Sequence, residues 1–413
     1  MSYYPSPFGH VPQSSFHAGA FDAFGRQRVS QIQTLFDSKM LNDNLPLFWD
    51  DQEVSGSGTT SVYNQNRAGV TLGVAAATAG HRRRQTRQHF NYQPGKSQMI
   101  LMTGVPVLTG GGTGITVQMG LFDGDNGICF CIADGVPGFR IRSNVTGSPV
   151  DTTTTQPNWN VDTLDGNGPS GITLDPTKAQ IVYFDFEWLG VGSVRMGFVI
   201  DGQYVIVHKQ HNANVINSVY MSSPNLPLIY EIINDGTGAA TTMEQICSTV
   251  MSEGGTSQRA STRGVTTGGI GITPANLAVA AAIGIRLKAS AHNQSLDLSD
   301  ISIVNEGNTP GFEWHLYFNP TVAGTFTYSD LANSHVQLAI GNAAGTNTIT
   351  GGTLLATGVG TGAKTGGLAQ AALDTEIKPG SSIDGTSDEF VLAVVPYGAQ
   401  AEIDVALNWR ERT

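Results

Sequence analysis

The sequence predicts an all-β protein made of antiparallel β-sandwich domains, of the jelly-roll or lectin-like type, preceded by an extended N-terminal arm. Charged residues make up only 13% of the chain, about half of the ~25% that globular proteins carry on average. Long solvent-facing helices need charged residues on their outer face, so this composition disfavours them. Glycine occurs 51 times in 413 residues. Together with Asn, Asp, Ser and Thr it separates many short β-prone runs, which is typical of strands joined by turns.

Residues 1–50 are predicted to form the arm, because their apolar residues follow neither the period of a strand nor that of a helix. A disordered tail is normally poor in aromatic residues, whereas phenylalanines recur throughout this segment. We therefore expect the arm to pack on its own body or on another subunit. Our working prediction is docking on a partner through six residues: Phe8, Phe16, Phe21, Phe24, Arg26 and Arg28.

Residues 51–250 are predicted to form a β-sandwich domain. Its clearest part is a three-stranded meander over residues 181–189, 194–200 and 203–208. Between the last two strands, Asp201-Gly202 is suited to the positive backbone angles of a type I′ hairpin turn. A short helix around residues 243–250 is a competing interpretation of that segment. Further strands are expected at residues 98–108, 115–122, 128–133, 139–143 and 227–233.

Residues 251–274 are rich in Gly, Ser and Thr and are predicted to be a linker or a long surface loop. Strand patterns resume afterwards, so residues 275–413 are predicted to form a second β-rich unit, with completion of the first sandwich as the alternative. Residues 341–367 are nearly uncharged and are expected to form weak strands around a loop. The stronger strands are expected at residues 279–289, 296–304, 312–319, 336–340, 390–396 and 401–409.

The charge of the chain argues against nucleic-acid and membrane partners. Its formal net charge of -11 repels nucleic acid and anionic membrane surfaces. The longest apolar run, residues 277–285, is too short to span a bilayer, and residues 1–12 lack a secretion signal pattern. We therefore expect synthesis in a cytoplasm without a secretion signal. The three cysteines do not define a disulfide framework and are expected to be buried thiols: Cys129, Cys131 and Cys247.

The predicted strand over residues 181–189 carries a pair of acids. Its even-numbered residues from 182 to 188 are apolar, so Asp185 and Glu187 share the opposite face with Tyr183. Retaining glycosidases need two carboxyl groups about 5 to 5.5 Å apart, which this spacing permits. The strand also resembles the acidic strand of lectin-like jelly-roll glucanases, but Tyr183 stands where that three-acid pattern has its first acid. The alternative, which we expect, is that both carboxylates form the solvated face of an amphipathic strand.

An arginine-rich run, HRRRQTR at residues 81–87, stands out in so acidic a chain. Strand alternation would place Arg82 and Arg84 on one side and Arg83 and Arg87 on the other. Arginine pairs with carboxylates within and between subunits, and it also binds phosphate and other anions. The alternatives are therefore ion pairs within or between subunits, a glycan or surface-anion site, and nucleic-acid binding.

No metal site or cofactor is predicted. His208 and His211 follow a strand but have no third ligand nearby in the sequence. Residues 123–127, DGDNG, begin like a calcium loop, but the loop lacks an oxygen ligand at its fifth position and the closing Glu. We expect a turn between two strands there. The glycine cluster at residues 110–114 lacks the Lys-Ser/Thr ending of a phosphate loop and is expected to be a loop.

Several runs of the sequence resemble those of virion structural proteins of tailed bacteriophages and aquatic viruses. The resemblance spans most of the chain, and it brings no catalytic residues with it. It implies a component of a virus particle, such as a fibre, an adhesin or a capsid-surface protein. The runs are FGRQRVS at residues 24–30, LFD at 35–37, YQPGKSQ at 92–98, GPSGI at 168–172 and LNWRE at 407–411.

This resemblance leads to the prediction of a non-enzymatic virion protein. The arm is expected to attach it to other virion proteins or to a sister subunit, and the β-sandwich body to project for adhesion to a host-surface glycan, as a tail fibre or tail-associated protein. A trimer is expected by analogy with projecting viral β-proteins. The alternatives are a capsid decoration or head-fibre protein, a polysaccharide-degrading tail enzyme using Asp185 and Glu187, and a glycan-binding module in which exposed Trp159 or Tyr183 stacks on sugars.

Overall fold

The computed structural model describes residues 22–23, 25–26, 31–254, 259–307, 310–361, 368–372, 376–398 and 401–412, and the statements below concern these residues. They form antiparallel strands and three one-turn 3-10 helices, η1 (Gln65–Arg67), η2 (Gln156–Asn158) and η3 (Ala289–Ala291). The all-β antiparallel fold that the sequence predicts is therefore confirmed. The chain divides into two compact units, which are described separately.

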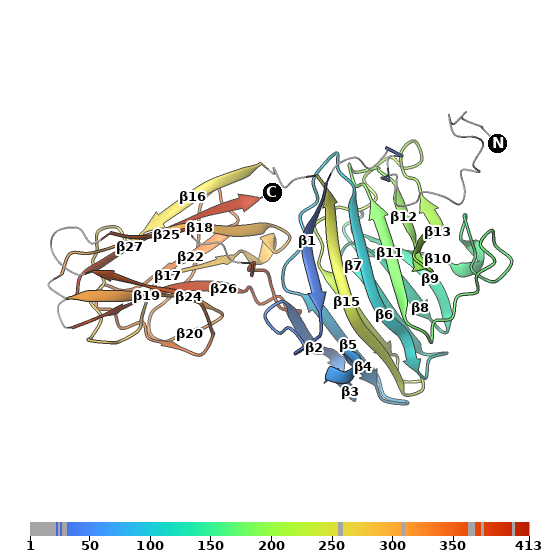
Figure 1. Ribbon diagram of the computed structural model, residues 1–413, viewed down its shortest axis with the longest axis horizontal. Coiled ribbons are helices and arrows are strands. Elements are labelled where there is room, and N and C mark those ends of the chain that lie inside the picture. The colour runs from blue at the N-terminus through green and yellow to red at the C-terminus, as the bar shows by residue number, and fades with distance from the viewer. Residues whose placement is uncertain are drawn as a thin grey trace. The chain divides into compact units, whose positions relative to one another are not determined.

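Unit 1 contains the described residues of 1–46, 51–84 and 92–257. Its first sheet has the strand order β13-β12-β11-β6-β15-β4-β3, and β1 also pairs with β15 (Figure 1). The strands of this sheet are β1 (Ile32–Lys39), β3 (Thr59–Asn64), β4 (Gly69–Val74), β6 (Gln98–Thr109), β11 (Gln180–Phe186), β12 (Val194–Ile200), β13 (Gln203–Gln210) and β15 (Thr241–Glu253).

The second sheet of unit 1 has the order β10-β9-β8-β7-β14-β5-β2. The first two residues of β2 and the last two of β5 are assigned to unit 2. The strands are β2 (Trp49–Gly56), β5 (Gly80–Thr86), β7 (Ile115–Phe122), β8 (Gly127–Ala133), β9 (Val136–Ser143), β10 (Val150–Thr155) and β14 (Leu228–Asn234).

An aromatic cluster centred on Phe139 of β9 joins the two sheets of unit 1. The ring centroid of Phe139 lies 5.3 Å from that of Trp159, 5.9 Å from Phe198 of β12 and 6.0 Å from Phe184 of β11. All four side chains are buried, and complete burial of a large apolar side chain contributes about 1.5 to 3 kcal/mol. The alternation predicted for β11 places Phe184 in this core, as expected.

The predicted meander is confirmed, because β11, β12 and β13 are neighbours in the first sheet. Asp201 and Gly202 have φ of 50° and 73°, and Ile200 pairs with Gln203 across this two-residue turn. The helix considered for residues 243–250 is wrong, because that segment lies in β15 and pairs with β6 on one side. On its other side β15 pairs with β4 and then with β1.

The last part of the predicted arm forms β1, a strand of unit 1. It runs antiparallel to β15 from the pair Ile32 and Glu253 to the pair Lys39 and Cys247. Phe36 is buried on this strand. The prediction of an extended arm is therefore wrong for residues 32–39, which form a strand of a sheet in unit 1.

Unit 2 contains residues 47–50 and 85–91 and the described residues of 258–413. Its sheets have the orders β16-β27-β18-β25, β21-β22-β17-β26-β19-β24 and β20-β23. The strands are β16 (Ala260–Thr266), β17 (Ala280–Leu287), β18 (Ser295–Asn305), β19 (Gly311–Phe318), β20 (Thr321–Val322), β21 (Ser329–Asp330), β22 (Val336–Ile340), β23 (Ile349–Thr350), β24 (Thr353–Thr361), β25 (Leu368–Ala372), β26 (Glu389–Pro396) and β27 (Ile403–Arg412).

One buried cluster joins the two larger sheets of unit 2, with Ile285, Trp314 and Leu392 from one sheet and Ile301 and Trp409 from the other. Unit 2 is therefore a sandwich with a core of its own, and its strands pair with one another rather than with the sheets of unit 1. Part of the segment predicted as a linker, residues 251–274, forms the end of β15 and the whole of β16.

Candidate functional site

Strand β11 carries Asp185, the first of the two acids considered for glycosidase chemistry, and Glu187 follows it. Tyr183 and Asp185 lie on the side of the strand opposite to Phe184, as the alternation predicts, and Glu187 directly follows the last residue of the strand. All three are nevertheless fully buried, with 0% of their surface exposed. The interpretation of Asp185 and Glu187 as a solvated face is therefore wrong, because residues distant in the sequence cover this side of the strand.

Asp185 is held by hydroxyl groups and by a cation. The hydroxyl of Ser97 donates a short hydrogen bond to one carboxylate oxygen. The hydroxyl of Tyr183 donates to the other oxygen over 3.0 Å. Arg195 of β12 lies with Nη1 3.8 Å from the same oxygen. These contacts offset part of the cost of burying the charge.

Glu187 lies beside two residues of the N-terminal segment, which we call the Asp22/Arg26 pair. Nη2 of Arg26 is 3.6 Å from Oε1 of Glu187 and donates to the carbonyl oxygen of Gly95 over 3.1 Å. Asp22, itself only 1% exposed, accepts from the backbone N and from Nε of Arg26 over 2.7 and 2.6 Å. The hydrogen bond to Asp22 raises the pKa of Arg26, so its charge is secure beside Glu187.

Aromatic rings pack on the residues before and after Glu187. Tyr92 stacks on Phe186 with ring centroids 5.8 Å apart, and its ring meets that of Trp188 edge-on at 6.3 Å. The hydroxyl of Tyr220 donates to the carbonyl oxygen of Glu187 over 3.4 Å. Burial raises the pKa of Tyr92 to about 12, so its hydroxyl is neutral at physiological pH.

The arrangement around β11 is that of a packed polar network. A retaining glycosidase needs one carboxylate to attack the sugar and a second carboxyl group to protonate the leaving oxygen, and both must reach the substrate. Here Asp185 and Glu187 are buried, and Tyr183 occupies the first acid position with its hydroxyl bonded to Asp185. The geometry supports a structural role for these carboxylates better than a catalytic one.

The aromatic residues proposed for sugar stacking are also buried, so that interpretation of Trp159 and Tyr183 is wrong. Trp159 is 4% exposed, its ring packs in the core, and its indole N–H donates to the carbonyl oxygen of Thr154 over 3.1 Å. The ring of Tyr183 meets that of Tyr204 at 5.0 Å. Neither side chain presents a face to solvent.

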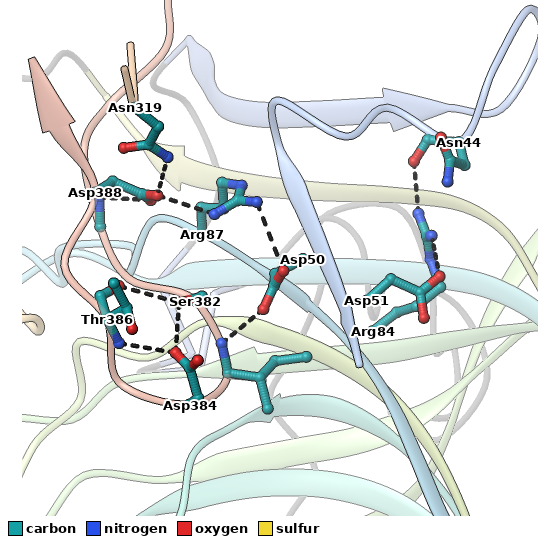
Figure 2. Close-up of polar contacts among 12 residues, drawn as sticks. Asn44, Asp50, Asp51, Arg84, Arg87, Asn319, Ser382, Asp384, Thr386 and Asp388 are labelled. Atoms are coloured by element: carbon teal, nitrogen blue, oxygen red, sulfur yellow. Dashed lines mark hydrogen bonds and ion pairs between the residues drawn. The ribbon is translucent and has the colours of Figure 1, made fainter. Parts of the chain in front are cut away.

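The arginine-rich run begins in β5. Its first three arginines, residues 82–84, belong to unit 1, and their side chains alternate between two carboxylate partners, as predicted. Arg82 and Arg84 both pair with Asp51, whereas Arg83 pairs with Glu231 over 2.7 Å. Arg84 is 0% exposed. Its three nitrogens donate to Asp51, to the side-chain oxygen of Gln245 and to the carbonyl oxygen of Asn44, over 2.6 to 2.7 Å. Figure 2 shows the contacts with Asp51 and Asn44.

Arg87 follows β5 and belongs to unit 2. Its Nη1 donates to Asp388 over 2.9 Å, and its Nη2 lies 3.5 Å from Asp50 (Figure 2). Asp388 also accepts from Asn319 over 2.6 Å. Of the roles weighed for Arg82, Arg83, Arg84 and Arg87, these contacts are those of ion pairs within the chain.

Glu231, the carboxylate that pairs with Arg83, has a strongly shifted pKa. Its burial alone would raise its pKa, but Arg83 and His81 outweigh that effect and lower the pKa of Glu231 to about 2. His81 lies 2.9 Å away, and Gln118 donates to the other carboxylate oxygen over 2.5 Å. The carboxylate is therefore ionised across the physiological range.

Within the described ranges no group of three or more His, Cys, Asp or Glu side chains is placed to hold a metal ion. The loop over residues 123–127 forms the expected turn between β7 and β8. Asp123 accepts from the backbone N of Asp125 and of Asn126 over 2.7 Å each. Cys129 and Cys131 are buried free thiols and Cys247 is half-buried.

Five of the six predicted docking residues, Phe8, Phe16, Phe21, Phe24 and Arg28, lie outside the described residues. Arg26 is described and contacts its own chain. Sequence reasoning missed the residues that cover the acidic strand, chiefly Asp22, Ser97, Gly95 and Arg195. The sequence does single out two of them: Gly95 and Ser97 belong to the YQPGKSQ run, which resembles virion proteins.

These sheets and this closed polar network define an antiparallel β-sandwich protein with a buried acidic strand. No protein family matches the sequence, and no curated protein matches it. Among the described residues no helix is both long and apolar enough to cross a membrane.

Several solved structures of lectin-like and jelly-roll type are similar in fold. An endo-1,3-beta-glucanase from Streptomyces sioyaensis shares 11% identity at a TM-score of 0.36, over 54% of this chain and 97% of its own. The Emp47p carbohydrate recognition domain shares 11% identity at a TM-score of 0.33, over 55% and 98%. A legume lectin-like domain from Entamoeba histolytica shares 10% identity at a TM-score of 0.32, over 55% and 100%. The likeness is one of fold alone.

Proposed function

We propose that this chain is a non-enzymatic structural component of a virus particle. In this proposal the N-terminal segment attaches it to the particle, and the β-sandwich body serves adhesion to the host surface as a tail fibre or tail-associated protein. The observation that carries the proposal is that two of the runs resembling virion proteins meet at β11. Arg26 of the first run contacts Gly95 of another, and Ser97 of that second run holds Asp185.

This network supports anchoring of the N-terminal segment rather than catalysis. Arg26 bridges Asp22, Gly95 and Glu187, so the chain that follows Phe8, Phe16 and Phe21 is fixed to the body at this point. Burial of these three phenylalanines on a partner would contribute about 1.5 to 3 kcal/mol each, enough for attachment after the cost of ordering the segment. A trimer of such bodies stays an expectation by analogy.

Immunogold labelling of purified virus particles with an antibody against residues 51–250 tests the proposal. Label at the tail tip or on fibres is the expected result and supports adhesion. Label over the capsid would favour the alternative of a decoration or head-fibre protein. If particles that contain the chain's gene carry no label at all, the virion proposal is wrong.

The second candidate is a polysaccharide-degrading enzyme that uses Asp185 and Glu187. Their positions two residues apart in the sequence favour it, and their burial weighs against it. Incubation of the purified protein with host capsular polysaccharide distinguishes the two. Release of reducing ends that is lost in a folded Asp185→Asn/Glu187→Gln variant would establish the enzyme, whereas we expect no release from the unaltered protein.

A further inference from the structure

A groove of about 820 Å³ opens at one side of unit 1, where the outermost strands of the two sheets, β13 and β10, both line it. Ligand pockets usually have about 300 to 1,000 Å³, so this volume suits a small ligand. Tyr183, Asp185 and Glu187 do not line the groove, although Tyr220, which does, donates to the carbonyl oxygen of Glu187. Nothing described so far gives the groove a function.

The β13 side of the groove is a row of polar side chains that fix one another. His208, Gln210 and Asn212 follow one another at the two-residue spacing that places them on one face. Gln210 donates to the side-chain oxygen of Asn212 over 3.3 Å, and Asn212 donates to the carbonyl oxygen of Gly192 over 2.7 Å. The row is therefore pre-oriented before any ligand arrives.

His208 is neutral in this row. Its Nδ1 accepts from the backbone N of Asn160 over 3.3 Å, which leaves the proton on Nε2. Burial lowers the pKa of His208, and a hydrogen bond with Gln210 opposes this shift. At neutral pH the ring thus offers hydrogen bonding without charge.

The opposite side of the groove combines hydroxyl groups with an apolar floor. Thr152 and Thr154 of β10 line it two residues apart, and Phe139 and Ile141 of β9 line it beside them. The mouth is formed by the loop after Asn212, where Val215 is 71% exposed. Amides and hydroxyls face an apolar floor, a combination that matches a sugar ring, which has hydroxyls at its edge and C–H groups on its faces.

Charge decides between classes of ligand. Among the described residues that line the groove there is no Asp, Glu, Lys or Arg. An anionic glycan, a phosphate or a charged peptide would lose hydration there without gaining an opposite charge. A purely apolar chain would leave the row of His208, Gln210 and Asn212 facing carbon instead of water or hydrogen-bond partners.

We infer that this groove binds a short, neutral oligosaccharide. The inference rests on the adhesive role proposed above, for which it names the ligand class and the binding site. Sugar binding by the purified chain does not depend on where the protein lies in a particle. A negative labelling experiment would therefore contradict the proposed function alone, and a negative binding experiment would contradict this inference alone.

The test is binding of the purified full-length chain to a defined panel by isothermal titration calorimetry. The neutral probes are the tetrasaccharides of β-1,3-glucose, β-1,4-glucose, α-1,4-glucose, β-1,4-mannose and β-1,4-N-acetylglucosamine. Sialyllactose and a heparin tetrasaccharide serve as anionic probes, and laurate serves as an apolar chain. We expect a neutral tetrasaccharide to bind with a Kd of about 1 mM or lower, and the anionic probes and laurate not to bind.

Matched variants locate the binding site. Thr152→Val with Thr154→Val removes two hydroxyls from the groove at constant shape and should weaken binding roughly tenfold. Thr153→Val removes the hydroxyl between them, which faces Arg140 instead, and should leave the affinity unchanged. Val215→Asp adds a charge at the exposed mouth without disturbing the core, and it should also weaken binding severalfold.

The inference is overturned if no neutral tetrasaccharide binds at about 10 mM. It is equally overturned if laurate or an anionic probe binds in preference, or if a bound sugar is unaffected by Val215→Asp and by the double valine variant. Should the double variant fail to fold, Val215→Asp alone decides, because its site is on the surface.

Discussion

Two ionised side chains of unit 1, Arg84 and Glu231, are buried, and each is held by an opposite charge. Arg84 is fully buried against Asp51, and Glu231 is 2% exposed beside Arg83 and His81. Replacing both partners of such a pair by apolar groups can be neutral, but removing one partner leaves a buried charge uncompensated. Single substitutions in these pairs should therefore be costly, and much costlier than at exposed pairs.

Arg84→Lys should destabilise unit 1 by about 3 to 5 kcal/mol, because an ammonium group cannot replace the three donors that reach Asp51, Gln245 and Asn44. Arg82→Lys is the matched control. Arg82 pairs with the same Asp51 from a side chain that is 19% exposed, so we expect Arg82→Lys to destabilise unit 1 less than Arg84→Lys does. Urea unfolding measures both, and equal losses would contradict the role assigned to burial.

Glu231 should make unit 1 sensitive to acid. Its pKa is about 2 in the folded chain and 4.5 in its ordinary state, so the unfolded chain binds the proton more readily between these values. The stabilisation is complete above about pH 4.5 and is lost as the pH falls toward 2, with a total of about 3 kcal/mol. Glu231→Gln should be less stable than the unaltered protein at pH 7, and the difference should shrink through this window in pH-dependent urea unfolding. A constant difference would contradict the prediction.

At the scale of single elements, the hairpin between β12 and β13 shows how a short sequence signal determines structure. Asp201 and Gly202 both have positive φ, and the turn sets the register in which Ile200 faces Gln203. That register holds as far as the pair Gly197 and Ile206, and it shifts by one residue before Met196 pairs with His208. The face on which His208 and Gln210 lie is therefore set by the turn and by this irregularity together.

Gly202→Ala should destabilise unit 1 by about 1 kcal/mol through backbone strain at positive φ. No atom lies within 4 Å of an added Cβ at Gly202, so no clash adds to that cost. Gly124→Ala is the control, since its site is equally open and its φ is not in the positive region. Thermal unfolding compares them. A loss for Gly124→Ala as large as that for Gly202→Ala would show that the backbone angle is not the cause.

Local sequence predicted the strands well where apolar and polar residues alternate, as in β7, β12 and β22. It missed β1, whose sequence IQTLFDSK has little alternation and which owes its place to pairing with β15. For the candidate site, alternation correctly placed Asp185 on the same face as Tyr183, with Glu187 directly after the end of the strand. It could not predict their burial, because Arg26 and Ser97, which cover that face, are contributed from far along the chain.

On the scale of the whole molecule, unit 2 is not a continuous stretch of sequence. Residues 47–50 and 85–91 belong to it, although the sequence suggested a linear order of arm, sandwich, linker and second unit. Buried Trp49 and Phe90 come from these two segments. So does Arg87, which pairs with Asp388.

A fragment of residues 258–413 should therefore not fold as unit 2 does in the full chain. It lacks Trp49 and Phe90, and it leaves Asp388 without Arg87. Burial raises the pKa of Asp388, and Arg87 opposes that shift. We expect the fragment to be aggregated or to melt at least about 10 °C below the full chain, judged by calorimetry. Co-expression with residues 1–257 is the control and should restore the folded form. If the fragment alone melts at the same temperature as the full chain, residues 47–50 and 85–91 are not needed for the fold of unit 2.

Removal of the N-terminal segment tests attachment in the whole assembly. A chain lacking residues 1–21 retains the Asp22/Arg26 pair, so its body should keep its melting temperature within about 2 °C while losing incorporation into particles. A chain lacking residues 1–30 also loses Arg26 from beside Glu187, and it should melt at a lower temperature than the shorter deletion. Incorporation of either chain at the normal level would argue against docking through Phe8, Phe16 and Phe21.

Because unit 2 is built from three separate stretches of the sequence, its parts are synthesised at different times. Asp50 leaves the ribosome about 350 residues before Ile403 of β27, which at roughly 5 to 20 residues per second is a delay of tens of seconds. During that time the later strands of the unit to which Trp49 and Phe90 belong have not yet been made. Chaperone binding to the nascent chain should accordingly concentrate on these two segments until the last strand is translated.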